Sequence, residues 1–480
     1  MDFKSNYEIV IIGSGAGAAA LLETLVENSF DPSEILVLER GKILPSSKSA
    51  ASRFINTYEN AGVVPCFGSP TIPFGIANCI GGGPEINGSL IWKTPEHIKN
   101  DWFENYELPF SKNIFEEKLA SFEMKLEVKN SHIDENHDYG SYLLNKAAKE
   151  LDFLCVPARR ALKYSCCSNN LCAFGSTNDS KNTTYKMIIK NLIKKGLNIK
   201  SNVSKINFNF SNQSGPYTLN FKLNSIAKTV IAKKIFLCAG AINTPLLVSK
   251  IRKKRYAKYN LKFHLNLKSI GLLKDEIPDV PGTMFSAQIQ EFSKENQYIM
   301  PFNWHKAHVL SILDRHYCEL DFDYIYRHGI GITSQVSNKD VNATIQVLSN
   351  GSSAFKFISH SIIEKESILN AIKTVLERTY LVFNKLGIDK VLCPSAKSPV
   401  FKLSESISKT MKKPSHLDML SVHHMSSLPI GGKDVEVDGS LKDFSNIFIA
   451  DSSLLPTIVG ESPQLTIMAF VSSLYNKKFN

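Results

Sequence analysis

Ile9-Val-Ile-Ile-Gly-Ser-Gly-Ala-Gly-Ala18 is the stretch that decides the fold. A buried apolar strand runs into a glycine turn, and a helix of small residues follows over 18–26. Gly13 allows the tight turn and Gly15 lets the backbone approach a pyrophosphate, while Ala18 permits close packing of the helix on the strand. The start of such a helix also presents unpaired N–H groups to phosphates.

A second strand, 34–39, ends in an acid. Glu39 stands about 20 residues after the turn, the distance at which such an acid accepts a hydrogen bond from a ribose hydroxyl. Ala16, inside the turn, and Arg40, after the acid, are further candidate contacts. Strand, turn, helix, strand and terminal acid together favour a dinucleotide-binding unit over a merely structural one.

The chain has 480 residues, of which 43% are hydrophobic and 21% charged. These values are typical of a globular protein with two or three domains. No apolar run approaches the roughly 20 residues that span a bilayer, and the first residues lack the apolar core of a signal peptide. We therefore expect no membrane span and a cytoplasmic location.

The nine cysteines are scattered, and Cys166, Cys167 and Cys172 form the one cluster. A zinc or iron–sulfur site needs a fourth ligand and usually a C-x-x-C spacing, and the sequence shows neither. We expect incidental or buried thiols and no metal.

The net charge is +11, and the densest basic run is Lys250-Ile-Arg-Lys-Lys-Arg255, followed by Lys258. Such a run can serve nucleic acid or anionic lipid, but a solvated helix end in a lysine-rich protein is favoured. We expect no nucleic acid, and leave open an acidic substrate or an acidic protein partner.

Patterning predicts the secondary structure outside the opening unit. Residues 62–100 are rich in glycine and proline, a composition that predicts a long, functional loop. Helices are expected at 113–126, 142–151, 184–195 and 362–386, and strands at 199–208, 217–223, 228–238, 263–267, 285–291, 298–302 and 343–348.

Near the end of the chain the pattern of the first strand returns. Residues 446–451 read as a buried strand, and a helix over 463–474 closes the chain. The first domain is therefore expected to be discontinuous, with the middle of the chain inserted into it. The predicted parts are 1–255, including the loop 62–100; an inserted 256–415; and a return segment, 416–480.

Two later strands favour FAD over NAD, since both cofactors share the ADP half. One strand ends in the small residues Ala239 and Gly240. Such residues are typical of places where the backbone passes close to a ligand. The other ends in Asp451, followed by Ser452, at the sheet edge where ligands bind. Asp451 can reach the ribityl or ribose hydroxyls of a flavin dinucleotide. It can also cap a following helix, and the two roles are compatible.

Four motifs spread over nearly the whole chain resemble the glucose–methanol–choline (GMC) family of FAD oxidoreductases. They are the opening fingerprint with Glu39; Cys79-Ile-Gly-Gly-Gly-Pro-Glu-Ile-Asn-Gly88; Gly240-Ala-Ile-Asn-Thr-Pro-Leu-Leu247; and a C-terminal block of Val422-His-His-Met-Ser-Ser-Leu-Pro-Ile-Gly431, 447–451 and Gly460-Glu-Ser-Pro-Gln-Leu-Thr-Ile467. They do not specify a substrate.

The resemblance implies an α/β fold, in which a doubly wound, Rossmann-like FAD-binding domain carries an inserted α+β substrate domain built on an antiparallel sheet. It also implies the contacts of the flavin and the adenine. These are Gly82, Gly83 and Asn87 beside the isoalloxazine, Val203 at the adenine, and Pro463 and Gln464 at the pyrimidine edge, with Ser452 after Asp451.

By the same resemblance, the substrate is a primary or secondary alcohol, including a sugar or polyol. Its oxidation needs a hydride acceptor, flavin N5, and a base for the hydroxyl proton. His423 aligns with the family's catalytic histidine, and His424 is the fallback. Ser462 replaces the family's second active-site residue, a His or Asn, and a hydroxyl is a poor proton acceptor. We therefore expect His423 to act as the single base.

Other readings remain open at this point. Ser462 is compatible with a weak activity, or with a lyase-like reaction in which the bound flavin has a structural role. The basic run is compatible with a non-catalytic flavin protein that binds an acidic partner. The electron acceptor can be oxygen, a quinone or a redox protein. The cysteine cluster with Lys181 resembles a cysteine-containing loop of bacterial members, to which we assign a structural or lid role.

Overall fold

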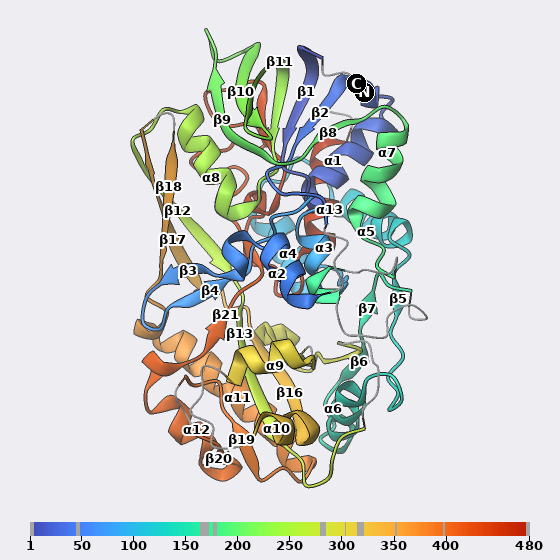
Figure 1. Cartoon of the computed structure of the whole chain (residues 1–480), viewed down its shortest axis with the longest axis vertical. Coiled ribbons are helices and arrows are strands. Elements are labelled where there is room, and N and C mark those ends of the chain that lie inside the picture. The colour runs from blue at the N-terminus through green and yellow to red at the C-terminus, as the bar shows by residue number, and fades with distance from the viewer. Residues whose placement is uncertain are drawn as a thin grey trace.

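Three large sheets and the helices around them form the molecule, as seen in a computed structural model (Figure 1). The structure describes residues 4–44, 49–163, 172–175, 180–278, 285–302, 304–313, 321–350, 353–396 and 399–476. Cys166 and Cys167, singled out above, lie outside these ranges.

A seven-stranded sheet carries the opening motif and lies at the top of Figure 1. Its strands are β1 (Asn6–Ile12), β2 (Ile35–Leu38), β8 (Asn198–Lys200), β9 (Val203–Asn209), β10 (Tyr217–Leu223), β11 (Ile226–Leu237) and β23 (Ile447–Ile449). Their order is β8–β2–β1–β11–β10–β9, and β23 pairs with the end of β11. The pairs among β8, β2, β1, β11 and β23 are parallel, whereas β10 is antiparallel to β11 and to β9.

Helices from distant parts of the chain pack beside this sheet. They are α1 (Ala16–Glu27), α5 (Lys112–Lys125), α7 (Lys190–Lys194), α8 (Gly240–Ile251) and α13 (Gln464–Tyr475). Helix α13 lies between α1 and α5. The hydroxyl oxygens of Thr24 in α1 and Ser472 in α13 are 2.7 Å apart, within hydrogen-bond distance. The C-terminal segment thus returns to the N-terminal sheet with both a strand and a helix.

A second sheet has six strands, and α8 packs on one of its faces. The strands are β3 (Val64–Phe67), β4 (Ile72–Phe74), β12 (Tyr256–Phe263), β17 (Asn342–Ser349), β18 (Ala354–Ser359) and β22 (His424–Met425), in the order β22–β12–β17–β18–β3–β4. Figure 1 shows β12, β17 and β18 at the margin of the molecule.

The third sheet, low in Figure 1, is antiparallel throughout its pairs. Its strands are β6 (Cys155–Pro157), β13 (Leu265–Leu272), β14 (Ala287–Ile289), β15 (Gln297–Pro301), β16 (Gly329–Val336), β19 (Lys390–Leu392), β20 (Phe401–Lys402) and β21 (Met419–Leu420). Around it lie α6 (Tyr139–Glu150), α9 (Lys306–Leu313), α10 (Phe322–His328), α11 (Glu366–Lys385) and α12 (Leu403–Met411). Helix α11 covers β16 with a buried stripe that includes Ile368, Ile372 and Val375.

A largely parallel sheet flanked by helices, joined to one mixed and one antiparallel sheet, confirms the predicted fold class. Strands from before residue 256 enter the two lower sheets, namely β3, β4 and β6. The domain boundaries at 255/256 and 415/416 stay a prediction. The remaining elements are α2 (Ala50–Thr57), α3 (Gly83–Ile86), α4 (Glu96–Asn105), β5 (Lys129–Asn130) and β7 (Arg159–Arg160).

Three predicted elements differ from the structure. The strand expected at 199–208 is two strands, β8 and β9, because the chain turns at Asn202, whose φ is +57°. The strand expected at 263–267 is the end of β12 and the start of β13, with His264 between them. The loop 62–100 contains β3, β4, α3 and the first turn of α4, because proline and glycine there punctuate short elements.

Candidate active site

One cavity of about 1310 Å³ runs between the upper sheet and the two lower ones. Pockets for one drug-sized ligand typically measure about 300–1,000 Å³, so this cavity has room for a cofactor and a substrate. It gathers the predicted site residues from both ends of the chain: Gly13, Gly15, Ala16, Glu39, Arg40, Gly82, Gly83, Asn87, Val203, Ala239, Gly240, His423, His424, Asp451, Ser452, Ser462, Pro463 and Gln464. Ala18 is buried inside α1 and does not line it.

The turn after β1 is packed too tightly for side chains. Gly13 has φ +103°, and a Cβ there would stand 2.2 Å from the carbonyl oxygen of Cys238. A Cβ on Gly17 would stand 2.1 Å from the carbonyl oxygen of Ala450. The turn and the start of α1 therefore lie close against the ends of β11 and β23, at Gly13 and Gly17, while the close packing predicted for Ala18 stays a prediction.

The same turn leaves open space toward the cavity. Gly15 is the N-cap of α1, and no side chain caps that helix, whose first turn holds no acid. A Cβ on Gly15, Gly83 or Gly240 would meet no heavy atom within 4 Å. The positive end of α1 therefore faces the cavity without a protein anion, an arrangement that fits a diphosphate.

Hydrogen bonds to the side chain of Glu39 connect the turn after β1 to the end of β2. Its carboxylate accepts hydrogen bonds from Ser14 N (3.0 Å), Ser14 Oγ (2.7 Å) and Gly41 N (2.6 Å). A carboxylate has about four acceptor positions, so one is left for a ribose hydroxyl. Arg40 next to it is held by Asn78 Oδ1 and Glu59 Oε2.

Asp451 has capping contacts on both oxygens. Its Oδ2 accepts from Gly240 N (2.8 Å) and Thr244 Oγ1 (2.5 Å), and its Oδ1 accepts from the amide and hydroxyl of Ser453. The helix-capping alternative is therefore confirmed, at the start of the 3₁₀ turn over 452–454 and of α8. With about four acceptor positions taken, the direct bond to a flavin hydroxyl stays a prediction.

The segment predicted to face the isoalloxazine is fixed from two sides. Asn87 Nδ2 donates to Gln464 Oε1 (2.7 Å), which joins it to the start of α13. The buried ammonium of Lys181 donates to the carbonyl oxygens of Glu85, Asn87 and Cys172 at 2.8–3.2 Å. Burial lowers the pKa of Lys181. Lys181 thus fixes the polypeptide around this segment, and its contact to Cys172 fits the structural role assigned to that region.

His423 and His424 both line the cavity; His423 directly precedes the strand β22, and His424 is its first residue. Burial lowers the pKa of His423 to about 4, and burial together with the neighbouring His423 lowers that of His424 to about 3. Both imidazoles are therefore neutral near pH 7 and able to accept a proton. The His424 ring lies against Phe74, with centroids 4.4 Å apart.

His264 is a residue that the sequence did not single out. Its Nδ1 lies 3.0 Å from Nδ1 of His423, and the two rings are nearly perpendicular at 84°. His264 is fully buried, and burial holds its pKa well below the usual value. The contact arises because Phe263 in β12 pairs with His424 in β22, a register that no local motif announces.

Ser462 lines the cavity next to a buried acid, Glu461. Glu461 Oε1 accepts from Gln288 Nε2 (2.6 Å) and Gln290 Nε2 (3.0 Å) of the segment around β14. Burial nevertheless raises the pKa of Glu461 to about 8. The sequence analysis did not single out this carboxyl. Its hydrogen bonds connect the third sheet to the segment that directly precedes Pro463.

We expect Glu461→Gln to change the pH dependence of stability. In the unfolded chain the carboxyl of Glu461 loses its proton near the usual pKa of 4.5, whereas in the folded protein it keeps the proton up to about pH 8. Stability therefore falls as pH rises from about 4.5 to 8, by an amount on the order of several kcal/mol. Thermal denaturation across that range should show a shallower fall for Glu461→Gln. The exposed Glu117→Gln is the control, and equal pH slopes in all three proteins would contradict the assignment.

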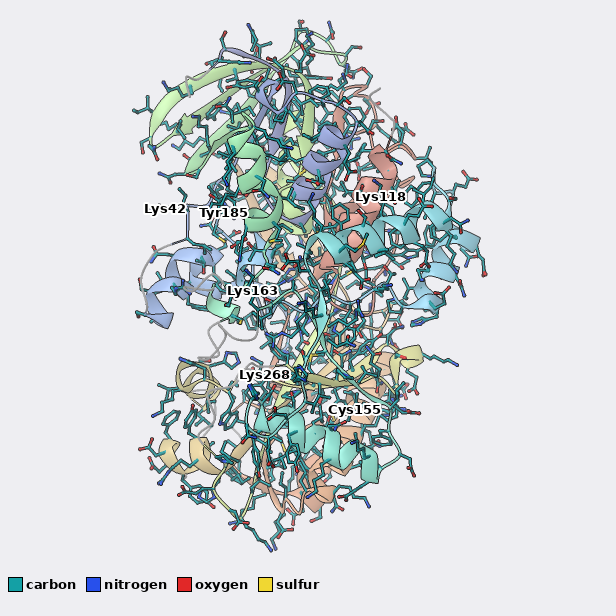
Figure 2. All side chains as sticks on the ribbon, turned by 90° about the vertical axis from the view of Figure 1, so that its right-hand side faces the viewer. Lys42, Lys118, Cys155, Lys163, Tyr185 and Lys268 are labelled. Atoms are coloured by element: carbon teal, nitrogen blue, oxygen red, sulfur yellow. The ribbon has the colours of Figure 1, made fainter. Side chains whose placement is uncertain are left out.

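The lower wall of the cavity presents polar side chains among apolar ones such as Met300 and Phe302. Asn266 and Lys268 from β13 and Thr333 and Gln335 from β16 line it. Lys268 Nζ lies 2.5 Å from His308 Nε2, and Figure 2 shows Lys268 in the lower half of the molecule, toward its middle. Such donors and acceptors suit a substrate with several polar atoms.

Within the described ranges, no group of three or more His, Cys, Asp or Glu side chains could hold a metal ion. Nor does any described helix have the length and apolar character needed to cross a bilayer.

Two models of the GMC oxidoreductase family match the chain, the N-terminal one at residues 54–265 and the C-terminal one at 344–470. Because these segments make up more than half of the sequence, the chain belongs to the GMC oxidoreductase family. Its cofactor is FAD, which the open glycines, the uncapped α1 and the remaining acceptor position of Glu39 fit.

Among similar sequences, the uncharacterized GMC-type oxidoreductase y4nJ of Sinorhizobium fredii is 21% identical over 98% of this chain and 94% of its own. Long-chain-alcohol oxidase FAO3 of Arabidopsis thaliana is 24% identical over 56% of this chain, but over 37% of its own length. Among solved structures, pyridoxine 4-oxidase from Mesorbium loti covers 98% of this chain and 99% of its own, with TM-score 0.73 and 12% identity. At that identity the likeness shows a shared fold.

Proposed function

We propose that this oxidoreductase oxidises a hydroxyl group of a polar small molecule, with His423 as the base that takes the hydroxyl proton. One observation carries the proposal: a neutral imidazole, held through its Nδ1, lines the same cavity as the dinucleotide turn. The name of the plant relative, a long-chain-alcohol oxidase, supports the hydroxyl as the reacting group. Asn266, Lys268, Thr333 and Gln335 of the lower wall offer hydrogen-bond partners for a sugar, polyol or similar alcohol.

FAD, when bound, supplies the hydride acceptor at N5. The chain's own residues supply the rest. The start of α1 and Glu39 would hold the diphosphate and ribose, Val203 would contact the adenine, and the Asn87–Gln464 hydrogen bond fixes the segments that would lie beside the ring. Asn266 and Gln335 orient the substrate, so that its hydroxyl proton reaches Nε2 of His423.

The hydrogen bond between the two histidines is compatible with the reactive tautomer of His423. To accept a proton at Nε2, His423 must carry its own hydrogen on Nδ1 and donate it to Nδ1 of His264. That bond persists when His423 becomes an imidazolium, and it stabilises the charge. His264 is therefore a positioning residue, comparable to the group that orients the base in a catalytic triad.

We expect His264→Leu to lower the rate of substrate oxidation on the order of a hundredfold, because the base loses its acceptor. His264→Asn keeps an acceptor near the Nδ1 position and should retain most of the rate. The measurement is the anaerobic rate of flavin reduction against pH, with His97→Asn, outside the cavity, as control. Equal losses in His264→Leu and His264→Asn, with unchanged pH profiles, would indicate a merely structural histidine.

A second candidate function rests on Ser462, which stands where the family has His or Asn. Its hydroxyl cannot serve as a second base, so a reaction in which the flavin is never reduced remains a competing reading, as does a non-catalytic flavin protein. An anaerobic screen of alcohols and sugars decides between them, because only the oxidation proposed here bleaches the flavin.

Reoxidation of the reduced flavin by oxygen, a quinone or a redox protein then identifies the electron acceptor. The cytoplasmic location stays a prediction.

A further inference from the structure

The outer face of the six-stranded sheet, opposite α8, carries large apolar side chains in solvent. Tyr256, Leu348 and Phe355 lie in register across β12, β17 and β18, and are 49%, 56% and 70% exposed. In the next row, Phe357 stacks on Phe67 of β3, with centroids 4.8 Å apart and planes at 7°. We call these five residues the aromatic face. Contiguous apolar surface of this kind usually marks an interaction site.

The basic run found in the sequence meets the aromatic face at Lys258, whereas Lys253 and Arg255 just before β12 line a small pocket with Asn207 and Asn209 of β9. Arg255 directly precedes Tyr256, and Lys258 stands over the Tyr256 ring at 5.8 Å. Lys253, Lys254, Arg255 and Lys258 are all exposed. Among the described residues none of these four makes an ion pair, whereas Arg252 just before them pairs with the buried Asp434. Within the described ranges these four exposed cations have no ion-pair partner, and we call them the basic cluster.

We infer that the aromatic face and the basic cluster together dock this protein on an anionic lipid surface. Aromatic rings partition into the interface between headgroups and acyl chains, and lysine and arginine beside them reach the headgroups. Each such cation adds attraction to an anionic leaflet.

The charge argues against a second copy of this chain as the occupant. A symmetric pair would gather both basic clusters at a single interface, although residue i of one copy meets residue j of the other. Like charges facing across a desolvated interface are repelled, and the chain as a whole carries +11. An anionic surface instead complements both the cluster and the net charge.

The docking surface continues into the cavity wall. Val63 and Pro65 at β3 and Ala354 at β18 line the cavity, and Val63 is itself 58% exposed. Docking would therefore place this side of the active-site cavity at the bilayer. The inference does not depend on which reaction the site performs.

Cosedimentation of the FAD-loaded protein with vesicles tests the inference. We expect binding to vesicles of phosphatidylcholine with phosphatidylglycerol, and much less to phosphatidylcholine alone or at high salt. Phe355→Ser with Phe357→Ser should weaken binding by roughly tenfold or more, as should Lys254→Glu with Arg255→Glu. Ile226→Ser, at an exposed apolar residue of the upper sheet, should bind as the parent does.

Unchanged FAD content and melting temperature would show that the variants fold. The inference is overturned if the parent does not bind anionic vesicles, or if the phenylalanine variant binds them equally well. Light scattering provides a further check. A dimer that dissociates on Phe355→Ser with Phe357→Ser would identify the face as an interface between copies instead.

Discussion

Replacing His423 by glutamine should lower the anaerobic rate of flavin reduction by about 10²–10⁴-fold while FAD stays bound. Glutamine keeps a polar side chain of similar reach but cannot accept a proton near neutral pH. Stopped-flow absorbance, with an alcohol that bleaches the parent flavin, measures the loss. Binding of FAD should not change, because the side chain is assigned to the proton and not to the dinucleotide.

The adjacent histidine supplies the matched control. His424 has the same burial and lines the same cavity, but its ring lies against Phe74 and pairs with no second histidine in the described structure. His424→Gln should therefore lose much less of the rate. If His424→Gln shows the larger loss, the roles of the two histidines are reversed. If neither variant affects reduction, no imidazole at this position acts as the base.

Gly15→Asp should yield a folded protein without FAD. A Cβ at this position meets nothing within 4 Å, and φ of −73° suits any residue, so the protein accommodates the side chain. Aspartate is also a favoured N-cap, which supports α1. Its carboxylate, however, occupies the space and the positive helix end assigned to the diphosphate. We expect the flavin absorbance of the purified protein to be lost.

Gly15→Asn separates charge from bulk, because it has nearly the same size without the negative charge. It should retain FAD better than Gly15→Asp does. The melting temperature of the aspartate variant should match that of the parent after FAD removal, which shows an intact fold. A Gly15→Asp protein that still carries stoichiometric FAD would place the diphosphate elsewhere.

Much of the fold was predictable because its signals are local. The strand–turn–helix unit at Gly13 and Gly15 and the closing strand and helix near Asp451 have patterns that the chain carries in single short segments. The same holds for β10, whose alternation over 217–223 gave its bounds as observed. The cavity also gathers almost every candidate residue, because each belongs to a motif with a fixed place relative to the sheet.

What escaped prediction depends on contacts between distant segments. His264 gains its place only when β12 pairs with β22, and Glu461 only when the segment around β14 reaches the start of α13. His264 lies in none of the four motifs, and the motif that contains Glu461 does not reveal the burial of its carboxyl. The break at Asn202 likewise depends on one residue with a left-handed backbone, which an alternating pattern does not reveal.

The most direct test is a crystal structure of the FAD-loaded protein, read for the position of the flavin ring. The account predicts the diphosphate at the start of α1, and the reactive face of the ring opposite His423, across a gap that admits one small alcohol. A ring bound far from His423, or a diphosphate away from Gly15, would contradict it.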